Sequence, residues 1–339
     1  MSLLQNLTTH IVRPGGPHWQ TFINVPIQSG NYLDSQILLR NQLNHQFLKY
    51  GILLRDGDKS VGRLALYQNP GLQYQTQQTG MIGNYECIQS TAVAHHLLSE
   101  AERACKAAGC SFVLGPMNGS TWDQYRMTIH PERPPFFTEQ TQPSYYLEQW
   151  ESFGFQSIGE YCSAMDSKLN SDHIPTTDMS DLQARGIRIR QIHLDQYEQE
   201  LEQIYTLCRE GFAHNYLYSP ISREEFLAKY LPMKSMIAPE WVLLAENENQ
   251  VPVACIFCLP DYTSTDQRRL VAKTIVRHPD QRWSGIGSVL AKMITTNAKE
   301  AGFESVIHAF LLHDGNGKKI SAHFHGDIIQ TYRLYGKYC

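Results

Sequence analysis

The sequence lacks several features that would place it in a broad class at once. Its longest apolar runs, such as "VPVACIFCLP" at 251–260, fall far short of the roughly 20 residues that a membrane-spanning helix needs. The N-terminus has no basic segment leading into an apolar core, so we expect no secretory signal. With a net charge of −4, the chain has no basic excess that would favour nucleic acid or an anionic membrane surface as a partner. These absences favour a globular protein of the cytoplasm.

The cysteines and histidines give little sign of a redox or metal site. Cys105 and Cys110 flank an expected helix end, and Cys255 and Cys258 lie in an apolar segment. We therefore expect reduced, mostly buried thiols. A histidine-rich segment near the C-terminus contains His308, His313, Asp314, His323 and His325. Its spacing matches no metal-ligand motif, so we expect no metal cofactor.

Two segments of the chain resemble each other, and 339 residues leave room for two ordinary domains. "YGILLRDGDKSVGRLALYQNP" begins at Tyr50, and "EWVLLAENENQVPVACIFCLP" begins at Glu240, 190 positions later (240 minus 50). Each segment predicts two strands joined by a tight polar turn, which is a β-hairpin. Further along, a helix is expected to stop at Gly109 in the first copy and at Gly302 in the second, each followed by an apolar strand. The repeat therefore predicts two domains of similar plan.

The polar stretch 167–185 separates the two copies and indicates a linker. We therefore expect one domain at 1–166 and another at 186–339. The predicted fold class is α/β with an α+β mixed sheet: each domain holds a mixed, mainly antiparallel sheet flanked by helices.

A glycine-rich loop follows the hairpin of the second copy. The segment 269–278, "RLVAKTIVRH", alternates as a strand does, and apolar residues then recur on one face of a helix. Those residues are Ile286, Val289, Leu290, Met293 and Ile294. Gly285 and Gly287 lie where the helix begins, and the free N–H groups of a helix's first turn bind anions. Glycines remove the β-carbons that would hold a phosphate away from those groups.

Three kinds of phosphate loop place glycines at such a junction. A dinucleotide fingerprint needs a third glycine three residues after Gly287, but Leu290 stands there. A Walker A loop needs Gly-Lys-Ser or Gly-Lys-Thr, which this loop lacks. The remaining pattern, Arg/Gln-x-x-Gly-x-Gly/Ala, fits from Arg282 to Gly287.

This pattern, between a strand and a helix, resembles the pyrophosphate loop of the GNAT N-acetyltransferase superfamily. The order of hairpin, strand, loop, helix, Gly302, strand and Asn-containing loop also matches that superfamily across the second half of the chain. The first copy lacks the glycines: "ECIQSTAVAHHLLSEAERA" stands in place of "IVRHPDQRWSGIGSVLAKM", and Ser90 or Thr91 is its expected helix N-cap. Its ending, "PSYYLEQWESFGFQSIGEY", nevertheless resembles the closing segment of single GNAT domains. The resemblance implies two tandem GNAT-like domains, of which the first is degenerate and the second binds acetyl-CoA.

The resemblance also implies which residues of the second domain hold acetyl-CoA, as a co-substrate. The main chain of 275–277 would pair with the pantetheine arm, and the N–H groups of the 282–287 loop would hold the pyrophosphate. An asparagine in the loop after the next strand often contacts the cofactor arm in this superfamily. Arg282 either supplies charge near the phosphates or is a solvated side chain. The implied set is Ile275, Val276, Arg277, Arg282, Trp283, Ser284, Gly285, Ile286, Gly287 and Asn316.

Acyl transfer to an amine also needs a proton donor for the departing thiolate. Many superfamily members use a tyrosine seven residues after the asparagine, and His323 stands at that position here. Histidine suits the task because its pKa lies near neutrality, but a surface role for His323 fits equally well. Ser321 and His325 lie close enough in the chain to replace it. The preceding strand offers Lys273 and Arg277 rather than a carboxylate, so we expect a water-mediated base or none.

In the first copy, "GPMNGSTWDQYRM" at 115–127 occupies the position that the asparagine loop has in the second. Polar and aromatic side chains concentrate on this loop, and binding residues tend to gather on loops. We interpret Asn118, Trp122, Tyr125 and Arg126 as contacts for the acceptor substrate. The alternative is a purely structural loop.

The sequence therefore predicts an acetyl-CoA-dependent N-acyltransferase that moves an acetyl group to an amine of a small molecule by direct attack on the thioester. The degenerate first domain would shape the acceptor pocket. We expect a monomer or weak homodimer without nucleic-acid or membrane partners. Two alternatives stay open. One is an aminoacyl-tRNA-dependent tandem-GNAT transferase, which would need a basic face for the RNA; the other is a non-catalytic acyl-CoA-binding or scaffold protein.

Overall fold

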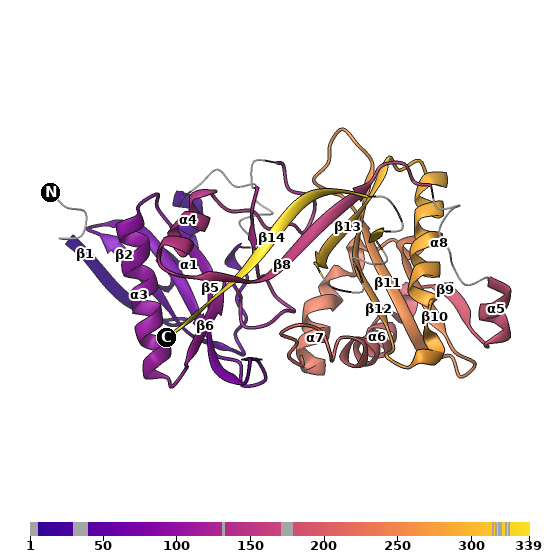
Figure 1. Cartoon of the computed structure of the whole chain (residues 1–339), viewed down its shortest axis with the longest axis horizontal. Coiled ribbons are helices and arrows are strands. Elements are labelled where there is room, and N and C mark those ends of the chain that lie inside the picture. Colours follow the sequence, from indigo (N-terminus) through magenta and orange to yellow (C-terminus); the bar gives the residue numbers. More distant parts are fainter. Residues whose placement is uncertain are drawn as a thin grey trace. The chain divides into compact units, whose positions relative to one another are not determined.

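Two compact units make up the computed structural model of the chain, and each has its own strands, helices and core (Figure 1). The first unit consists of Met1–Glu160, Leu217–Ser219 and Thr331–Cys339, and the second of Tyr161–Tyr216 and Pro220–Gln330. The structure describes residues 6–29 (26–29 by their backbone alone), 40–130, 133–170, 179–313, 315, 317, 321, 322, 324 and 326–339.

The sheet of the first unit follows the order β1-β2-β3-β5-β6-β14. These neighbours pair antiparallel except β5 and β6, which are parallel. Its elements are β1 (Leu7–Val12), α1 (Trp19–Ser29), β2 (Leu48–Asp56), β3 (Lys59–Tyr67), β4 (Gln73–Tyr74), β5 (Gln77–Cys87), α3 (Thr91–Ala107), β6 (Phe112–Gly115), β7 (Met127–Thr128), α4 (Tyr145–Ser152), the first part of β8 (Gln156–Asp166) and most of β14 (Asp327–Tyr338).

The sheet of the second unit follows the order β8-β13-β12-β11-β10-β9, again antiparallel except for one pair, β12 and β13. Its further elements are α5 (Met179–Ala184), β9 (Arg188–Gln191), η2 (Leu194–Gln196), α6 (Tyr197–Gly211), α7 (Arg223–Tyr230), η3 (Leu231–Met236), η4 (Pro239–Trp241), β10 (Val242–Glu246), β11 (Pro252–Pro260), β12 (Arg269–Arg277), η5 (Gln281–Trp283), α8 (Ile286–Glu300) and β13 (Ser305–Leu312).

The same order of elements recurs in both units, as the internal repeat predicts. A hairpin (β2–β3 or β10–β11) is followed by a strand, a long helix and a strand parallel to the one before it. Both helices stop where expected, because Gly109 and Gly302 adopt the left-handed conformation with φ of 79° and 77°. Ser90 caps α3, and its side chain accepts a hydrogen bond from the N–H of Val93. The fold class predicted from the sequence is confirmed.

Helix α8 buries the face that its apolar spacing predicts. Ile286, Val289, Leu290 and Ile294 are buried against the sheet of the second unit, and Met293 is partly buried beside them. Burying such a side chain stabilises the fold by about 1.5–3 kcal/mol. The stripe therefore fixes how the start of α8, with its two glycines, is presented at the end of β12.

The expected linker and the C-terminal end of the second domain differ from what the structure shows. Within the expected linker 167–185, residues 179–184 form α5, and 171–178 lie outside the described residues. The C-terminal segment Thr331–Cys339, expected in the second domain, belongs to the first unit. It does so because β14 pairs there with β6 and β7, for example Tyr335 with Gly115 and Tyr332 with Thr128.

Candidate functional site

Strands β12 and β13 stay paired for only part of their length. Their parallel register runs from Arg269 opposite Ser305 to Ala272 opposite His308. Beyond that point β12 continues to Arg277, after a bulge at Lys273, and among the described strands it pairs there with β11 alone. The segment 274–277 therefore presents one main-chain edge that β13 does not cover, and it contains the three strand residues assigned to the pantetheine arm.

A cavity opens beside the diverging strands and reaches toward α8. Its space, open solvent included, is about 500 Å³. The lining is mostly apolar: Ile256, Ala272, Ile275, Ala291, Ile294, Val306, Ala309, Leu311 and Phe324, with Gly317. Its polar members are Lys273, Thr274, Thr295, His308 and Ser321. An apolar slot with a few polar groups suits the chain-like part of a ligand.

The loop that follows β12 ends in an open helix N-terminus. Gly285 is the N-cap of α8 with φ of 86°, a conformation that favours glycine. The first bonds to its carbonyl come from the N–H groups of Ser288 and Val289, at 3.1 and 3.4 Å. Within the described part of the chain, no hydrogen-bond partner exists for the N–H groups of Gly285, Ile286 and Gly287. These donors and the helix dipole make a site for an anion.

Side chains at both ends of the loop hold its shape. Arg277 Nη1 donates to the carbonyls of His278 and Asp280, at 2.7 and 2.6 Å. The Asp280 carboxylate accepts from the N–H of Arg282 at 2.9 Å and pairs with its guanidinium. The hydrogen bond from the guanidinium, and after it the one from the main chain, lowers the pKa of Asp280. The Arg282 side chain is 73% exposed and lies over the Trp283 ring. Arg277 thus has a structural task besides the main-chain role that the resemblance implies.

Arg185 was missed by the sequence analysis, which placed it at the end of a polar linker. Its guanidinium donates to the carbonyl of Arg282, and both terminal nitrogens lie 3.4 Å from the carbonyl oxygen of Ser284. These contacts span 97 and 99 positions of the chain. No local pattern could have revealed them, because nothing near Arg185 in the sequence points to the loop.

His278 and Glu210 form a second pair that the sequence did not suggest. His278, directly after β12, has its Nε2 3.1 Å from Oε2 of Glu210 at the end of α6. Its Nδ1 accepts the N–H of Asp280 at 3.1 Å. A carboxylate therefore lies near the end of β12, although the strand itself carries none.

Of the predicted catalytic residues, Ser321 lies in the cavity wall. Its Oγ is 2.7 Å from Nδ1 of His308 on β13, and both residues are buried. Burial lowers the pKa of His308 to about 4. His323 lies outside the described residues, as does Asn316, so their assignments stay predictions. Asp314 and His325 of the histidine-rich segment lie outside them too.

No family model matches the chain. Among curated proteins, Protein YghO of Escherichia coli is 21% identical over 187 residues, which are 55% of this chain and 48% of that protein. The chain thus spans about half the length of this curated relative. A GCN5-related N-acetyltransferase from Sphaerobacter thermophilus has a similar structure, with a TM-score of 0.55 and 11% identity over 98% of this chain and 96% of that one.

Two further solved structures extend this likeness. A tandem GNAT protein from the clavulanic acid biosynthesis pathway gives a TM-score of 0.56 at 10% identity and covers 98% of each chain. N-myristoyltransferase of Saccharomyces cerevisiae, solved with bound myristoyl-CoA and inhibitors, gives 0.52 at 11% identity, over 99% of this chain and 81% of that one. The chain has a tandem GNAT fold. At these identities the likeness establishes the fold alone.

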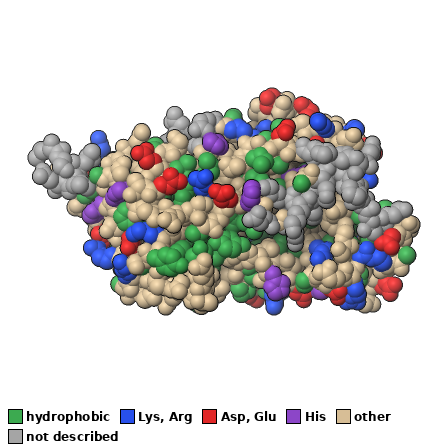
Figure 2. All heavy atoms as spheres, viewed as in Figure 1, with side chains coloured by type: hydrophobic (Ala, Val, Ile, Leu, Met, Phe, Trp, Pro, Cys, Tyr) green, Lys and Arg blue, Asp and Glu red, His purple; other side chains and the backbone are tan. Residues whose placement is uncertain are grey.

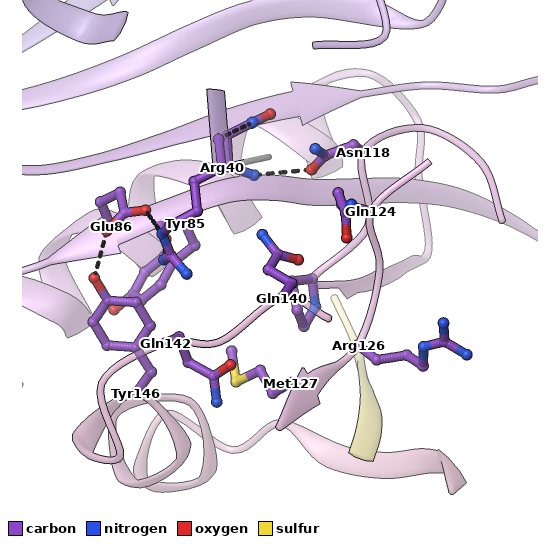
Figure 3. Close-up of a pocket in the computed structure, with 12 residues that line it drawn as sticks. Arg40, Tyr85, Glu86, Asn118, Gln124, Arg126, Met127, Gln140, Gln142 and Tyr146 are labelled. Carbon is purple, nitrogen blue, oxygen red and sulfur yellow. Dashed lines mark hydrogen bonds and ion pairs between the residues drawn. The ribbon is translucent and has the colours of Figure 1, made fainter. Parts of the chain in front are cut away.

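The first unit has the same kind of diverging strand pair, but the cavity beside it is lined by polar and ion-paired side chains. β5 and β6 pair only from Thr79 to Met81. Past that point, a salt bridge joins the buried side chains of Arg40 and Glu86, and the Tyr146 hydroxyl donates to Glu86 at 2.9 Å. Figure 3 shows Glu86 held between Arg40 and Tyr146. Helix α3 starts without glycine, and Ser90 already satisfies one donor of its first turn. That the second unit, and not this degenerate one, binds coenzyme A in the way usual for the superfamily stays a prediction.

The four residues predicted to contact the acceptor all belong to the first unit. Asn118 is buried: its Oδ1 accepts from the N–H of Asn84, and its Nδ2 donates to the carbonyl of Gln42. Trp122 donates from its indole to the carbonyl of Ser219 at 2.9 Å. The Arg126 guanidinium lies 3.9 Å from the centre of the Tyr125 ring. Asn118 and Arg126 line the polar cavity of Figure 3, whereas Trp122 and Tyr125 are not among its lining residues. Their role in acceptor binding stays a prediction.

The described residues were compared with the needs of a metal site and of a reactive thiol. No group of three or more histidine, cysteine or carboxylate side chains there is arranged to hold a metal ion. All eight cysteines are free, and seven of them are buried. Burial raises the pKa of Cys87, Cys105 and Cys255 to about 12, so these thiols are protonated at neutral pH. Among the described helices, none is both long and apolar enough to cross a membrane.

Proposed function

We propose that the protein is an acetyl-CoA-dependent N-acyltransferase that transfers an acetyl group to an amine of a small molecule. The observation that carries this proposal is the junction of two features in the second unit. The uncovered edge of β12 leads directly to a helix N-terminus with three N–H groups that lack a partner among the described residues. A ligand that combines a peptide-like arm with a pyrophosphate matches both, and coenzyme A has this composition.

In this proposal each part of the site takes one part of the co-substrate. The main chain of 275–277 pairs with the amides of the pantetheine arm as an added strand would. The N–H groups of Gly285, Ile286 and Gly287 bind the pyrophosphate. The apolar cavity receives the thioester end, where Ser321 can donate a proton to the departing sulfur. In this role Ser321 replaces His323, and Asn316 keeps the contact with the cofactor arm that the superfamily implies for it.

Charge favours a small acceptor over an aminoacyl-tRNA. On the face drawn in Figure 2, basic and acidic side chains are interspersed, and the whole chain carries a net charge of −4. RNA binding draws most of its affinity from clustered Lys and Arg. A cytoplasmic small-molecule amine is therefore the acceptor class that we propose.

Release of coenzyme A thiol tests this proposal directly. We expect the wild-type protein to release thiol from acetyl-CoA only when an amine is present. In a panel of aryl, alkyl and amino-sugar amines, some members should give a rate of thiol release well above that of the others. Mass spectrometry of the product should show a gain of one acetyl group. Acetyl-CoA binding without any amine-dependent release would favour the scaffold alternative, and the absence of binding would contradict the proposal.

Arg185→Ala should weaken acetyl-CoA binding without abolishing it. The substitution removes the hydrogen bonds that hold the carbonyls of Arg282 and Ser284, so the loop must be ordered by the ligand itself. A hydrogen bond contributes about 0.5–1.5 kcal/mol, so we expect the Kd to rise roughly three- to tenfold. Calorimetry measures this change. Arg268→Ala is the matched control, because Arg268 donates to the carbonyl of Ala301 at the opposite end of α8; an equal loss in both variants would contradict a local effect on the loop.

A further inference from the structure

The contact of His308 with Ser321 joins two parts of the chain at the point where the strands separate. His308 is the last residue of β13 in register with β12, opposite Ala272. Ser321 comes 13 positions later, and its Oγ is 2.7 Å from Nδ1 of His308. Both side chains are buried and both line the cavity that the proposed function gives to the thioester. A buried polar pair in an otherwise mostly apolar wall calls for a chemical explanation.

The two nitrogens of His308 face different surroundings. Nδ1 meets Ser321, whereas Nε2 has no hydrogen-bond partner among the described residues. Although it has no such partner, Nε2 is not fully buried. Because His308 lines the cavity, Nε2 is open to it. The edge of the ring packs against Phe324, with 5.2 Å between ring centres, and this contact holds the imidazole in place. Burial keeps the pKa of His308 near 4, so the ring is neutral at pH 7.

We propose that His308 and Ser321 form a proton relay that carries a proton from the attacking amine to the departing thiolate. This inference rests on the proposed function and specifies its chemistry. The amine nitrogen forms a bond to the thioester carbon, and its surplus proton passes to Nε2 of His308. The proton on Nδ1 then passes to Oγ of Ser321, whose own hydroxyl proton goes to the sulfur as the C–S bond breaks.

The relay balances without any other acid or base. One proton enters the imidazole and one leaves it, so the products are an amide and a neutral thiol, and the ring stays neutral throughout. The imidazole returns to its first tautomer by exchange with water. The relay accounts for β12, whose ionisable side chains, at Arg269, Lys273 and Arg277, include no carboxylate that could serve as base. It also gives Ser321, a weak acid alone, a partner that replaces its proton.

The substitution His308→Asn distinguishes a proton relay from a contact that only positions Ser321. The asparagine amide can still hydrogen-bond to Ser321 from about the place of Nδ1, but it cannot pass a proton on. We expect kcat to fall by about 100-fold or more in both His308→Asn and Ser321→Ala, the scale of general acid–base catalysis. The KM for acetyl-CoA should change less than about threefold, because neither side chain is assigned to binding. Ser321→Thr, which keeps a hydroxyl, should restore much of the rate.

Ser305→Ala serves as the matched control. Ser305 is a buried serine at the other end of β13, and it does not line the cavity. We expect its kcat to stay close to the wild-type value. Far-UV circular dichroism and acetyl-CoA calorimetry on every variant show whether the fold and the binding site are retained.

Solvent isotope effects and imidazole spectra give readouts that a structural role would not change. The wild-type proton inventory in mixed H₂O and D₂O should be curved, because more than one proton moves, and that of His308→Asn should not. ¹⁵N spectra should show His308 protonated at Nδ1. Near-wild-type turnover of His308→Asn, or protonation at Nε2, would overturn the relay while the acetyltransferase proposal survives. A wild type without amine-dependent thiol release would overturn both.

Discussion

Gly285→Glu is expected to weaken acetyl-CoA binding by at least about 100-fold, which corresponds to roughly 2.7 kcal/mol. Gly285 has φ of 86°, where a residue with a β-carbon is strained. The new side chain would stand at the start of α8, beside the N–H groups of Ile286 and Gly287, and its carboxylate would both occupy the anion site and repel a pyrophosphate. Calorimetric titration of acetyl-CoA into the two proteins measures the difference.

The expected loss must be separated from backbone strain and from added charge. Gly302→Glu provides that comparison, because Gly302 also has a positive φ, of 77°, and ends the same helix. A glutamate there brings similar strain and the same charge without approaching the loop, so acetyl-CoA affinity should stay close to that of the wild type. If both variants bind as well as the wild type, the glycines form a structural turn and the pyrophosphate assignment is wrong.

Local patterns in the sequence were sufficient to predict the strands and the helix that form the site. The hairpins follow from two apolar runs around a polar turn, and the face of α8 follows from the spacing of residues such as Val289 and Leu290. The position of Gly285 at the start of α8 follows from its place between a strand pattern and a helix pattern. Each of these features depends on neighbours within a few positions, which is why one sequence predicts them.

The residues that act over long separations could not be predicted in the same way. Arg185 reaches the loop across nearly 100 positions, and Arg40 meets Glu86 across 46. His308 was noted only as part of a histidine-rich segment, because its contact with Ser321 depends on where the chain returns after β13. The sequence also gave no sign that the C-terminal strand belongs to the first unit, since strand partners depend on topology rather than on local composition.

Glu86→Gln is expected to destabilise the protein by about 3–5 kcal/mol, the usual effect of leaving a buried charge without its partner. Glu86 is fully buried and bonded to Arg40 and Tyr146. Arg63 is buried nearby and donates to the carbonyl of Phe22 and to Asn41. Burial lowers the pKa of Arg63 to about 10, and the charge of Glu86 opposes that shift. Chemical denaturation of the full chain, followed by circular dichroism, measures the change.

A double substitution distinguishes this charge effect from a loss of packing. Arg40→Met together with Glu86→Gln removes both charges of the pair, and replacing a whole buried pair by groups of similar size is often nearly neutral. We therefore expect the double variant to recover at least half of the stability lost by Glu86→Gln alone. An additive loss in the double variant would show that the pair contributes through packing. Recovery would show that the Arg40–Glu86 pair beyond β5 and β6 stabilises this unit through the mutual compensation of its two charges.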